Sequence, residues 1–559
     1  MDHETTVGQY LVDRLSEIGL RHLFSIAGDY SIEWLNRYVT PSKIALIEEV
    51  NELNAGYAAD AYARMRGIGA LCTTYSAGSL CAVNPVAGAY VEKVPLVLIA
   101  GTPSIKRTLT FEQTGFCAHH FIAGRQTDLQ VFQYITVATI RLDDPDAAPG
   151  LIDYALRACI SQKRPVYIEL LQDIVDLPCP AAQDCLTRSR MLCSEPDLGD
   201  AIKAIAPKLA AASKPLLWLG VEINRFGLSG LALQLVEHFQ IPFVTELMSK
   251  SVLSEDHPLF AGVFDGQSSS GQVQSLMAQA DVVLALGIWL TDINDLGGGV
   301  DTAKTVFASF DTVKHGPDFW AQVTLDRFIK ALLTVERPSA SGSFTRIETA
   351  PDIEANPCAA ITYDGFYDIL PDYIDAHTIV SCDASLNYFG AIRLKVPGPG
   401  NFFAQTSYSA IGYAGPAATG LCLAREDGGK VLVLSGDGGF QMTAQCLSTQ
   451  TRFGLDPIIF IMDNGSYAVE QWLANAAYFA TDKPFYESCR LHRWDYAQLA
   501  GVFGCRGWRV QTRDELRKAV ADAMSNKDSP SIIQVMLPDK DLPANARWKI
   551  AIDAQTAPP

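Results

Sequence analysis

Two unbroken apolar runs, each followed at once by glycine and acidic residues, constrain this chain most strongly. The first run, Val431 to Leu434, leads into residues 436–439 (GDGG), and the second, Ile458 to Met462, leads into residues 463–465 (DNG). Short apolar runs that end in turn residues are typical of strands buried on both faces of a parallel sheet. The segment between them has helical spacing and Gly454 as its stop, so the sequence predicts a strand–helix–strand unit.

Adjacent parallel strands would bring Asp437 and Asn464 together at the carboxyl edge of one sheet, where open α/β sheets bind ligands. A carboxylate and an amide oxygen are hard ligands that suit Mg²⁺, which shares its coordination shell with phosphate and water. The neighbouring glycines let backbone N–H groups approach a diphosphate. The alternative is a tight turn with a solvated Asp437, followed by an ordinary Asn464-Gly465 turn.

The segments GDGGF and DNGSY resemble the cofactor motif of thiamin-diphosphate enzymes, and the resemblance extends over most of the chain. It is most specific to the pyruvate, indolepyruvate and phenylpyruvate decarboxylases. The family has Asn where this chain has Asp463, and usually Gly where it has Ser466. The resemblance implies that Mg²⁺ is held by Asp437, Asn464 and the Ser466 carbonyl. It also implies that the cofactor contacts Gly436, Asp437, Gly438, Gly439, Asn464 and Tyr467.

The segment NELNAGYAADAYAR resembles the part of these enzymes that carries the catalytic glutamate, which places that role on Glu52. In the family this residue bonds N1′ of the aminopyrimidine and thereby activates the cofactor, so Glu52 is both a catalytic and a cofactor-binding candidate. The small residues of the segment allow close packing, and burial raises the pKa of a carboxyl group. Read alone, Glu52 is a first-turn glutamate favoured by the helix dipole.

Four further residues match the decarboxylase subgroup: Asp29, the adjacent His119 and His120, and Glu470. Histidine titrates near neutrality, and carboxylates beside it can carry protons around a 2-oxo acid. Each of the four has an ordinary alternative as a turn aspartate, a surface histidine or a first-turn glutamate. The set is more diagnostic than any one member, because carboligases of the acetolactate synthase type usually lack the paired histidines.

The substrate pocket is predicted from residues that flank the cofactor motifs. By resemblance, Ile411 lies beneath the bent cofactor, although it could also be a core residue in a buried turn. Val469 should face the reacting centre, and Leu386, Tyr388 and Phe389 should approach the same pocket. An aromatic segment (WLANAAYFATDKPFYESCRLHRW) follows, and the tail supplies further apolar residues. Trp472, Trp548 or Ile552 could line the entrance or simply pack. We expect a substrate larger than pyruvate.

Bulk properties set the outer limits of the prediction. A chain of 559 residues is too long for one core, and a formal charge of −18 without a basic run argues against nucleic acid and against a membrane surface. Alternating strand and helix patterns predict doubly wound α/β domains, and the resemblance implies three parallel-sheet domains of the thiamin-diphosphate decarboxylase type. Their expected bounds are 1–180 (pyrimidine-binding), 200–340 (central) and 360–559 (diphosphate-binding).

The sequence thus predicts a thiamin-diphosphate and Mg²⁺ dependent enzyme that converts a 2-oxo acid to an aldehyde and CO₂. A carboligase acting on the same substrate class is the alternative within enzymes, and a catalytically silent scaffold subunit is the remote one. The resemblance implies a homodimer or homotetramer with active sites at the subunit interface. Thirteen scattered cysteines and the absence of a basic-then-apolar amino-terminal segment predict a cytoplasmic protein.

Overall fold

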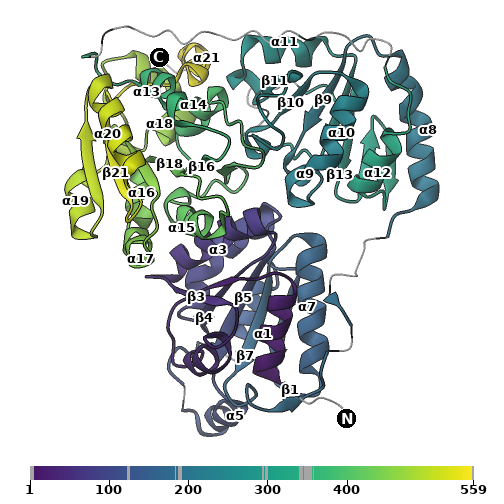
Figure 1. Cartoon of the computed structure of the whole chain (residues 1–559), viewed down its shortest axis with the longest axis vertical. Helices are drawn as coiled ribbons and strands as arrows, with labels where there is room; N and C mark the ends of the chain where they lie inside the picture. The colour runs from purple at the N-terminus through teal and green to yellow at the C-terminus, as the bar shows by residue number, and fades with distance from the viewer. Residues whose placement is uncertain are drawn as a thin grey trace. The chain divides into compact units, whose positions relative to one another are not determined.

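The computed structural model describes residues 5–116, 118–122, 126–182, 184–186, 192–292, 295, 300–338, 344, 356 and 358–556. It contains three large sheets, each flanked by helices, and contact clustering divides the chain into two compact units (Figure 1). Unit 1 comprises residues 1–190, 416–426 and 443–455, and unit 2 comprises 191–415, 427–442 and 456–559. The predicted class of three doubly wound α/β sheets is confirmed, whereas the predicted domain bounds stay a prediction.

Unit 1 is built on a six-stranded parallel sheet with the order β3-β2-β4-β5-β7-β6. The central strand β5 is buried at every residue, as expected for an apolar run covered on both faces. Two short strands, β1 and β8, form a separate antiparallel pair. The strands are β1 (Thr5–Thr6), β2 (His22–Ser25), β3 (Ala45–Glu48), β4 (Gly69–Thr74), β5 (Leu96–Thr102), β6 (Ala138–Leu142), β7 (Val166–Leu171) and β8 (Pro178–Cys179).

Helices cover the sheet of unit 1, and α1 and α7 lie side by side (Figure 1). The first helix begins where the sequence predicts, because the Thr6 side chain accepts a hydrogen bond from Gln9 N at 3.2 Å. The helices are α1 (Val7–Glu17), α2 (Ile32–Trp34), α3 (Glu52–Arg66), α4 (Val83–Val91), α5 (Ile105–Thr114), α6 (Thr127–Phe132), α7 (Ala148–Gln162), α15 (Ala414–Ala424) and α17 (Cys446–Arg452).

The first sheet of unit 2 has the order β11-β10-β9-β12-β13-β14-β15. Its first five strands are parallel, and an antiparallel hairpin, β14 and β15, extends the edge, so this sheet is mixed rather than wholly parallel. The strands are β9 (Pro215–Leu219), β10 (Phe243–Thr245), β11 (Phe260–Val263), β12 (Val282–Leu286), β13 (Thr305–Ser309), β14 (Thr312–His315) and β15 (Asp318–Ala321). The helices are α8 (Glu195–Ala211), α9 (Val221–Arg225), α10 (Ser229–Phe239), α11 (Gly271–Gln279) and α12 (Leu325–Leu332).

The second sheet of unit 2 is wholly parallel, with the order β17-β16-β18-β19-β21-β20. It contains both strands of the motif that the sequence singles out. The strands are β16 (Ile379–Cys382), β17 (Phe402–Ala404), β18 (Val431–Gly436), β19 (Ile458–Asp463), β20 (Arg506–Val510) and β21 (Ser531–Met536). The helices are α13 (Tyr363–Ile369), α14 (Asn387–Arg393), α16 (Asp437–Thr443), α18 (Ala468–Asn475), α19 (Tyr496–Val502), α20 (Arg513–Ser525) and α21 (Trp548–Thr556).

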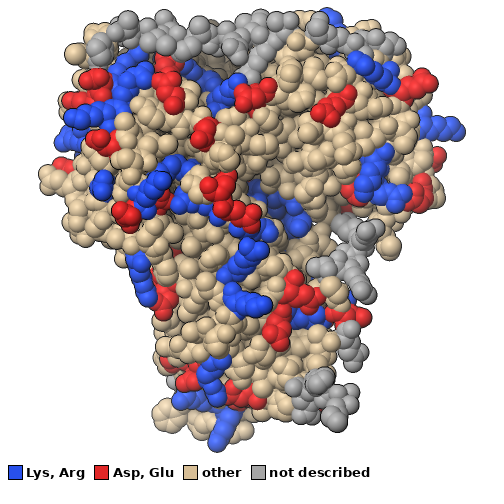
Figure 2. All heavy atoms as spheres, in the orientation of Figure 1, with Lys and Arg blue, Asp and Glu red and all other residues tan. Residues whose placement is uncertain are grey.

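One face of the molecule carries charged side chains of both signs. The face shown in Figure 2 has Lys and Arg side chains interspersed with Asp and Glu. Among the described residues, none of the helices combines the length and the hydropathy that a bilayer crossing requires.

The helical run between β18 and β19 is two helices rather than one. The first, α16, ends at Thr443, and the second, α17, begins at Cys446. The Thr443 carbonyl accepts a hydrogen bond from Asn54 Nδ2 at 3.4 Å, so it bonds to α3 at the break. The break therefore marks the place where the chain passes into unit 1.

A contact from α17 involves Glu49, a half-buried acid that follows β3 and lies three residues before Glu52. Thr449 Oγ1 donates a hydrogen bond to Glu49 Oε2 at 2.7 Å, whereas Glu49 Oε1 is buried and has no hydrogen-bond partner. Burial raises the pKa of this carboxyl from its ordinary value of 4.5 to about 7, and the bond from Thr449 opposes the rise only in part.

This raised pKa predicts a pH-dependent stability. The folded state binds the Glu49 proton more tightly than the unfolded chain does, so the stabilisation is present below pH 4.5 and is lost as pH rises through about 7. Replacing Glu49 by Gln removes this contribution. We expect the fall in thermal midpoint between about pH 5 and about pH 8 to be smaller in Glu49→Gln than in the unsubstituted protein.

The matched control is Glu48→Gln, one residue earlier in the chain. The Glu48 side chain is 41% exposed and pairs with Arg452, so its replacement should leave the pH dependence unchanged. An equal fall in thermal midpoint with pH in Glu49→Gln and in the unsubstituted protein would contradict the raised pKa of Glu49.

Candidate active site

The first half of the candidate site lies in unit 2, at the carboxyl ends of β18 and β19. The two strands are neighbours, with Gly436 opposite Met462. Asp437 begins α16 and Asn464 follows β19, and both side chains are buried. Asp437 Oδ1 accepts a hydrogen bond from Gly438 N at 2.8 Å, and Oδ2 accepts one from Gly465 N at 2.7 Å. One carboxylate therefore fastens the two strand ends together.

These oxygen atoms border one pocket. Its volume is about 340 Å³ including its open mouth. Asn464 Oδ1 accepts hydrogen bonds from Ser466 N at 3.1 Å and Ser466 Oγ at 3.2 Å, which orients the amide oxygen and the Ser466 carbonyl within one short loop. The predicted residues that line the pocket are Leu386, Ile411, Gly436, Asp437, Gly438, Gly439, Asn464, Ser466, Tyr467 and Val469.

The predicted residues Tyr388, Phe389 and Glu470 do not line this pocket. Tyr388 donates its hydroxyl hydrogen to the Gln405 carbonyl at 3.0 Å, and the Phe389 ring packs 4.5 Å from that of Trp472. Glu470 lies in the first turn of α18, exposed, one residue beyond Val469. Trp472 is fully buried and donates its indole N–H to the Ala546 carbonyl at 2.9 Å, so it packs in the core instead of lining an entrance.

Sequence reasoning missed Asp383, which follows β16 at the same sheet edge and is fully buried. It accepts hydrogen bonds from Gly412 N at 3.0 Å and Ser435 Oγ at 3.0 Å, and so holds the turn that carries Ile411. Burial raises its pKa to about 6. The available signal was an acid directly after an apolar run, the same signal that identified Asp437.

The electrostatics of this edge favour a cation. Burial and, second to it, the nearby charge of Asp463 together raise the pKa of Asp437 to about 7. Asp463 is buried, and its Oδ1 atom makes no hydrogen bond. A Cβ atom at Gly438 would overlap the Tyr467 ring, and one at Gly439 would overlap the Asp383 carboxylate, so the backbone lies open only because these residues are glycine. Hard oxygen donors and a glycine cradle fit Mg²⁺ with a diphosphate.

The second half of the candidate site lies in unit 1. Glu52 is the first residue of α3, whose N-terminus is capped by the Asn51 side chain through a 2.8 Å bond from Asn54 N. A Cβ atom at Gly78 would stand 3.1 Å from Glu52 Oε1, so the loop after β4 passes close to this carboxylate. Glu52 is partly exposed within its own unit.

Asp29, His119 and His120 come together in unit 1, as the sequence predicts for a set that acts jointly. His119 Nε2 lies 3.0 Å from Asp29 Oδ2, and the two imidazole rings are 4.7 Å apart. Their potential ligand atoms all lie within 4.8 Å of one another, and all three residues are exposed. His120 has φ +69°, a backbone conformation that is uncommon for a histidine and costs energy.

Two tyrosines that sequence reasoning missed contact His119, in the loop that carries the paired histidines. The Tyr30 ring stacks on His119 at 4.9 Å, and Tyr75 donates its hydroxyl hydrogen to the His119 carbonyl at 2.6 Å. Burial and the nearby Asp29 charge raise the pKa of Tyr30. Tyr30 follows Asp29, which the sequence analysis singles out, but nothing in the pattern gives the direction of either tyrosine side chain.

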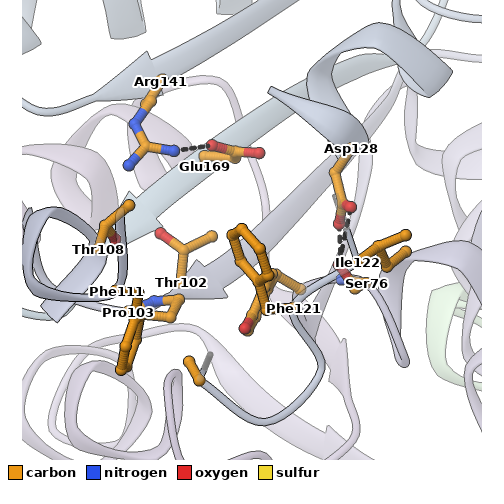
Figure 3. Close-up of a pocket in the computed structure, with 12 residues that line it drawn as sticks. Ser76, Thr102, Pro103, Thr108, Phe111, Phe121, Ile122, Asp128, Arg141 and Glu169 are labelled. Carbon is orange, nitrogen blue, oxygen red and sulfur yellow. Dashed lines mark hydrogen bonds and ion pairs between the residues drawn. The ribbon is translucent and has the colours of Figure 1, made fainter. Parts of the chain in front are cut away.

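A second pocket, of about 420 Å³ including its open mouth, is lined by residues on both sides of His119 and His120 and is shown in Figure 3. Arg141 and Glu169 lie on one side of it, 2.9 Å apart, and Asp128 lies on the other side. The buried Asp128 carboxylate accepts hydrogen bonds from Ser76 Oγ at 2.9 Å and Ser79 Oγ at 2.6 Å. Phe121 and Ile122, which follow His120, line the same pocket as Ser76 and Asp128.

Comparison with known proteins places this chain in a family. Three regions match the domains described as the N-terminal thiamine pyrophosphate-binding domain (residues 5–123), the central domain (202–334) and the C-terminal thiamine pyrophosphate-binding domain (385–535) of thiamine pyrophosphate enzymes. An alpha-keto-acid decarboxylase of Mycobacterium leprae is 30% identical over 96% of this chain and 94% of its own length. The chain belongs to the thiamin-diphosphate-dependent 2-oxo acid decarboxylase family.

Other family members agree over the whole length. A pyruvate decarboxylase of Hanseniaspora uvarum is 27% identical over 99% of both chains. A solved Mycobacterium smegmatis structure, titled as a thiamin diphosphate-dependent enzyme, superposes with a TM-score of 0.76 at 20% identity and covers 96% of this chain and 100% of its own, which supports the fold. The family assignment accounts for a diphosphate cradle of this kind.

The cradle generates a prediction about Gly438. A methyl group at this position overlaps the Tyr467 ring, so Gly438→Ala should displace the loop of residues 464–467. We expect the affinity for thiamin diphosphate with Mg²⁺ to fall by roughly tenfold or more, because the oxygen ligands lose their shared geometry. The measurement is the cofactor concentration that gives half of the maximal rise in thermal midpoint.

Gly501→Ala is the control. Gly501 lies in α19, and no atom stands within 4 Å of a Cβ atom built there. This variant should bind the cofactor as the unsubstituted protein does, or gain a little stability from the helix propensity of alanine. Equal cofactor affinity in Gly438→Ala and Gly501→Ala would contradict the role of residues 436–439 in binding the diphosphate.

Proposed function

We propose that this protein decarboxylates a 2-oxo acid larger than pyruvate, such as phenylpyruvate or indolepyruvate, with thiamin diphosphate and Mg²⁺. The observation that carries the proposal is the pocket at the β18–β19 edge, which combines buried oxygen donors with a glycine cradle. Its lining is otherwise largely apolar, and Asp437 is its only charged residue among those described. Apolar walls at Leu386, Ile411 and Val469 suit a substrate with an apolar side chain.

In this proposal Asp437, Asn464 and the Ser466 carbonyl hold Mg²⁺, and the N–H groups of the glycine segment receive the diphosphate. The cofactor supplies the electron sink that decarboxylation of a 2-oxo acid requires. Glu52 holds a proton at the aminopyrimidine ring and so sets its tautomer. Asp29, His119 and His120 move protons around the carboxylate and carbonyl of the substrate, because the 3.0 Å Asp29–His119 contact allows the charge of one to stabilise that of the other.

Assembly into at least a homodimer, and commonly a homotetramer, belongs to the same proposal. Apolar side chains are exposed near both halves of the site: Val50 is 42% exposed two residues before Glu52, and Met442 is 50% exposed on α16. Exposed apolar groups of this kind favour burial against a partner. A cytoplasmic location remains a prediction, which agrees with the lack of disulfides among the described cysteines.

The decisive experiment compares 2-oxo acids. We expect kcat/KM for phenylpyruvate or indolepyruvate to exceed that for pyruvate by about tenfold or more, because an apolar pocket discriminates by the apolar surface it buries. Each reaction is followed by CO₂ release and by identification of the product. The assay is repeated with an added aldehyde, since a carboligase would then form a 2-hydroxyketone in place of the free aldehyde. A preference for pyruvate would refute the substrate size, and a hydroxyketone as main product would refute decarboxylation as the main activity.

The role of Glu52 is tested by Glu52→Gln. We expect kcat to fall by roughly a hundredfold or more, because the amide cannot carry the proton that the pyrimidine ring requires. Exchange of the reactive ring proton of bound cofactor for deuterium should slow in parallel, whereas cofactor binding should persist. Glu48→Gln, which changes the exposed acid at the end of β3, should keep normal rates of both. Full activity in Glu52→Gln would contradict the assignment.

A further inference from the structure

Asp463, the last residue of β19, is a buried acid that the proposed chemistry does not use. Its side chain is 1% exposed, and Oδ2 accepts one hydrogen bond, from Gln534 Nε2 at 2.7 Å. Oδ1 makes no hydrogen bond, and the cation nearest to it in the described structure is Arg493, with Nε at 3.7 Å. A carboxylate buried with so few partners is costly unless positive charge lies nearby.

Asp463 lies immediately beside the proposed metal ligands. The register of β18 and β19 pairs Gly436 with Met462, so Asp437 and Asp463 are the next residues on two neighbouring strands. Asn464 follows directly. Two buried carboxylates thus stand at one sheet edge, where only Asp437 faces the pocket. Asp463 is therefore placed to influence a cation in the pocket through its charge and not as a ligand.

The positive charge of Arg493 lies beside the loop of residues 464–467, which carries the proposed ligands Asn464 and Ser466. It belongs to a strap, residues 489–493, that is hydrogen-bonded to this loop: Tyr467 N donates to the Cys489 carbonyl at 2.7 Å, and Leu491 N donates to the Gly465 carbonyl at 3.0 Å. The guanidinium packs on Gly465, where a Cβ atom would overlap Arg493 Nε, and it also pairs with Asp539 at 2.7 Å.

We propose that Asp463 and Arg493 form a charge-balancing pair that sets the affinity of the neighbouring site for its divalent cation. Asp463 strengthens cation binding, and Arg493 offsets part of that effect. The inference rests on the proposed Mg²⁺ site, and it adds two positioning residues that touch neither the metal nor the substrate. Because both charges are close to a doubly charged ion in a partly buried setting, each substitution should shift the affinity measurably.

The test is a double-mutant cycle on the metal-free full-length protein in the presence of thiamin diphosphate. Mg²⁺ is added, and its dissociation constant is measured by calorimetry and, with Mn²⁺ in its place, by electron paramagnetic resonance. Asp463→Asn keeps an oxygen that can accept the Gln534 bond but removes the charge, and we expect binding to weaken roughly three- to tenfold. Arg493→Gln should tighten binding by a similar factor. The double variant should return to within about twofold of the unsubstituted protein.

The sign of the Arg493 effect separates this proposal from a structural role. If Arg493 only held the loop in place, Arg493→Gln would weaken binding, and Arg493→Lys would share that loss. If its charge acts, Arg493→Lys keeps the unsubstituted affinity. Arg490→Gln is the matched control: it removes the same charge from the same strap, but Arg490 pairs with Glu487, which is 87% exposed, so affinity should change by less than about twofold.

Other outcomes overturn the inference in distinguishable ways. Complete loss of binding in Asp463→Asn would make Asp463 a ligand, and unchanged constants throughout the cycle would leave the pair without influence on the metal. If the unsubstituted protein bound no divalent cation with thiamin diphosphate, the proposed function would fail together with this inference. Thermal midpoints of the four proteins in chelator verify that each is folded before metal is added.

Discussion

The carboxylate of Asp437 is the contact on which the candidate site depends. It accepts hydrogen bonds from Gly438 N at the start of α16 and from Gly465 N in the loop after β19. A single side chain therefore fixes the distance between the glycine cradle and the loop that carries Asn464 and Ser466. Because the same group is also the proposed metal ligand, strand pairing in this sheet and cation binding share one geometry. Sheet order and register come from apolar burial, and this polar contact converts them into a binding site.

Much of this arrangement follows from the sequence, for a physical reason. Strands buried on both faces must be continuously apolar, so β9, β12, β18 and β19 are visible as runs, and a polar residue just beyond such a run must lie at the carboxyl edge. This reasoning locates Asp437 and Asn464 without any relative. Glu52 and the Asp29–His119–His120 group could not be found in that way, because their signals are ordinary in isolation; the resemblance to a family supplied them.

What the sequence does not give is the direction of side chains and the breaks that tertiary contacts impose. Tyr388 and Phe389 follow the same edge as Leu386, yet they point to Gln405 and Trp472, since a helix turns successive side chains by about 100°. At the break between α16 and α17, the Thr443 carbonyl accepts a hydrogen bond from Asn54, far away in the chain. The hairpin of β14 and β15 extends a parallel sheet with antiparallel strands, a choice that local periodicity does not determine.

The concentration of buried acids at one sheet edge has an energetic consequence. Asp383, Asp437 and Asp463 are all buried within the carboxyl ends of β16, β18 and β19, and burial raises the pKa of Asp383 and of Asp437. Hydrophobic residues of similar size would cost less there, so the edge is locally destabilised without a cation. A ligand that binds only the folded state raises its stability in proportion to the logarithm of ligand concentration. In the proposed site, cofactor binding would therefore stabilise this sheet, because the acids that are costly to bury would gain a charged partner.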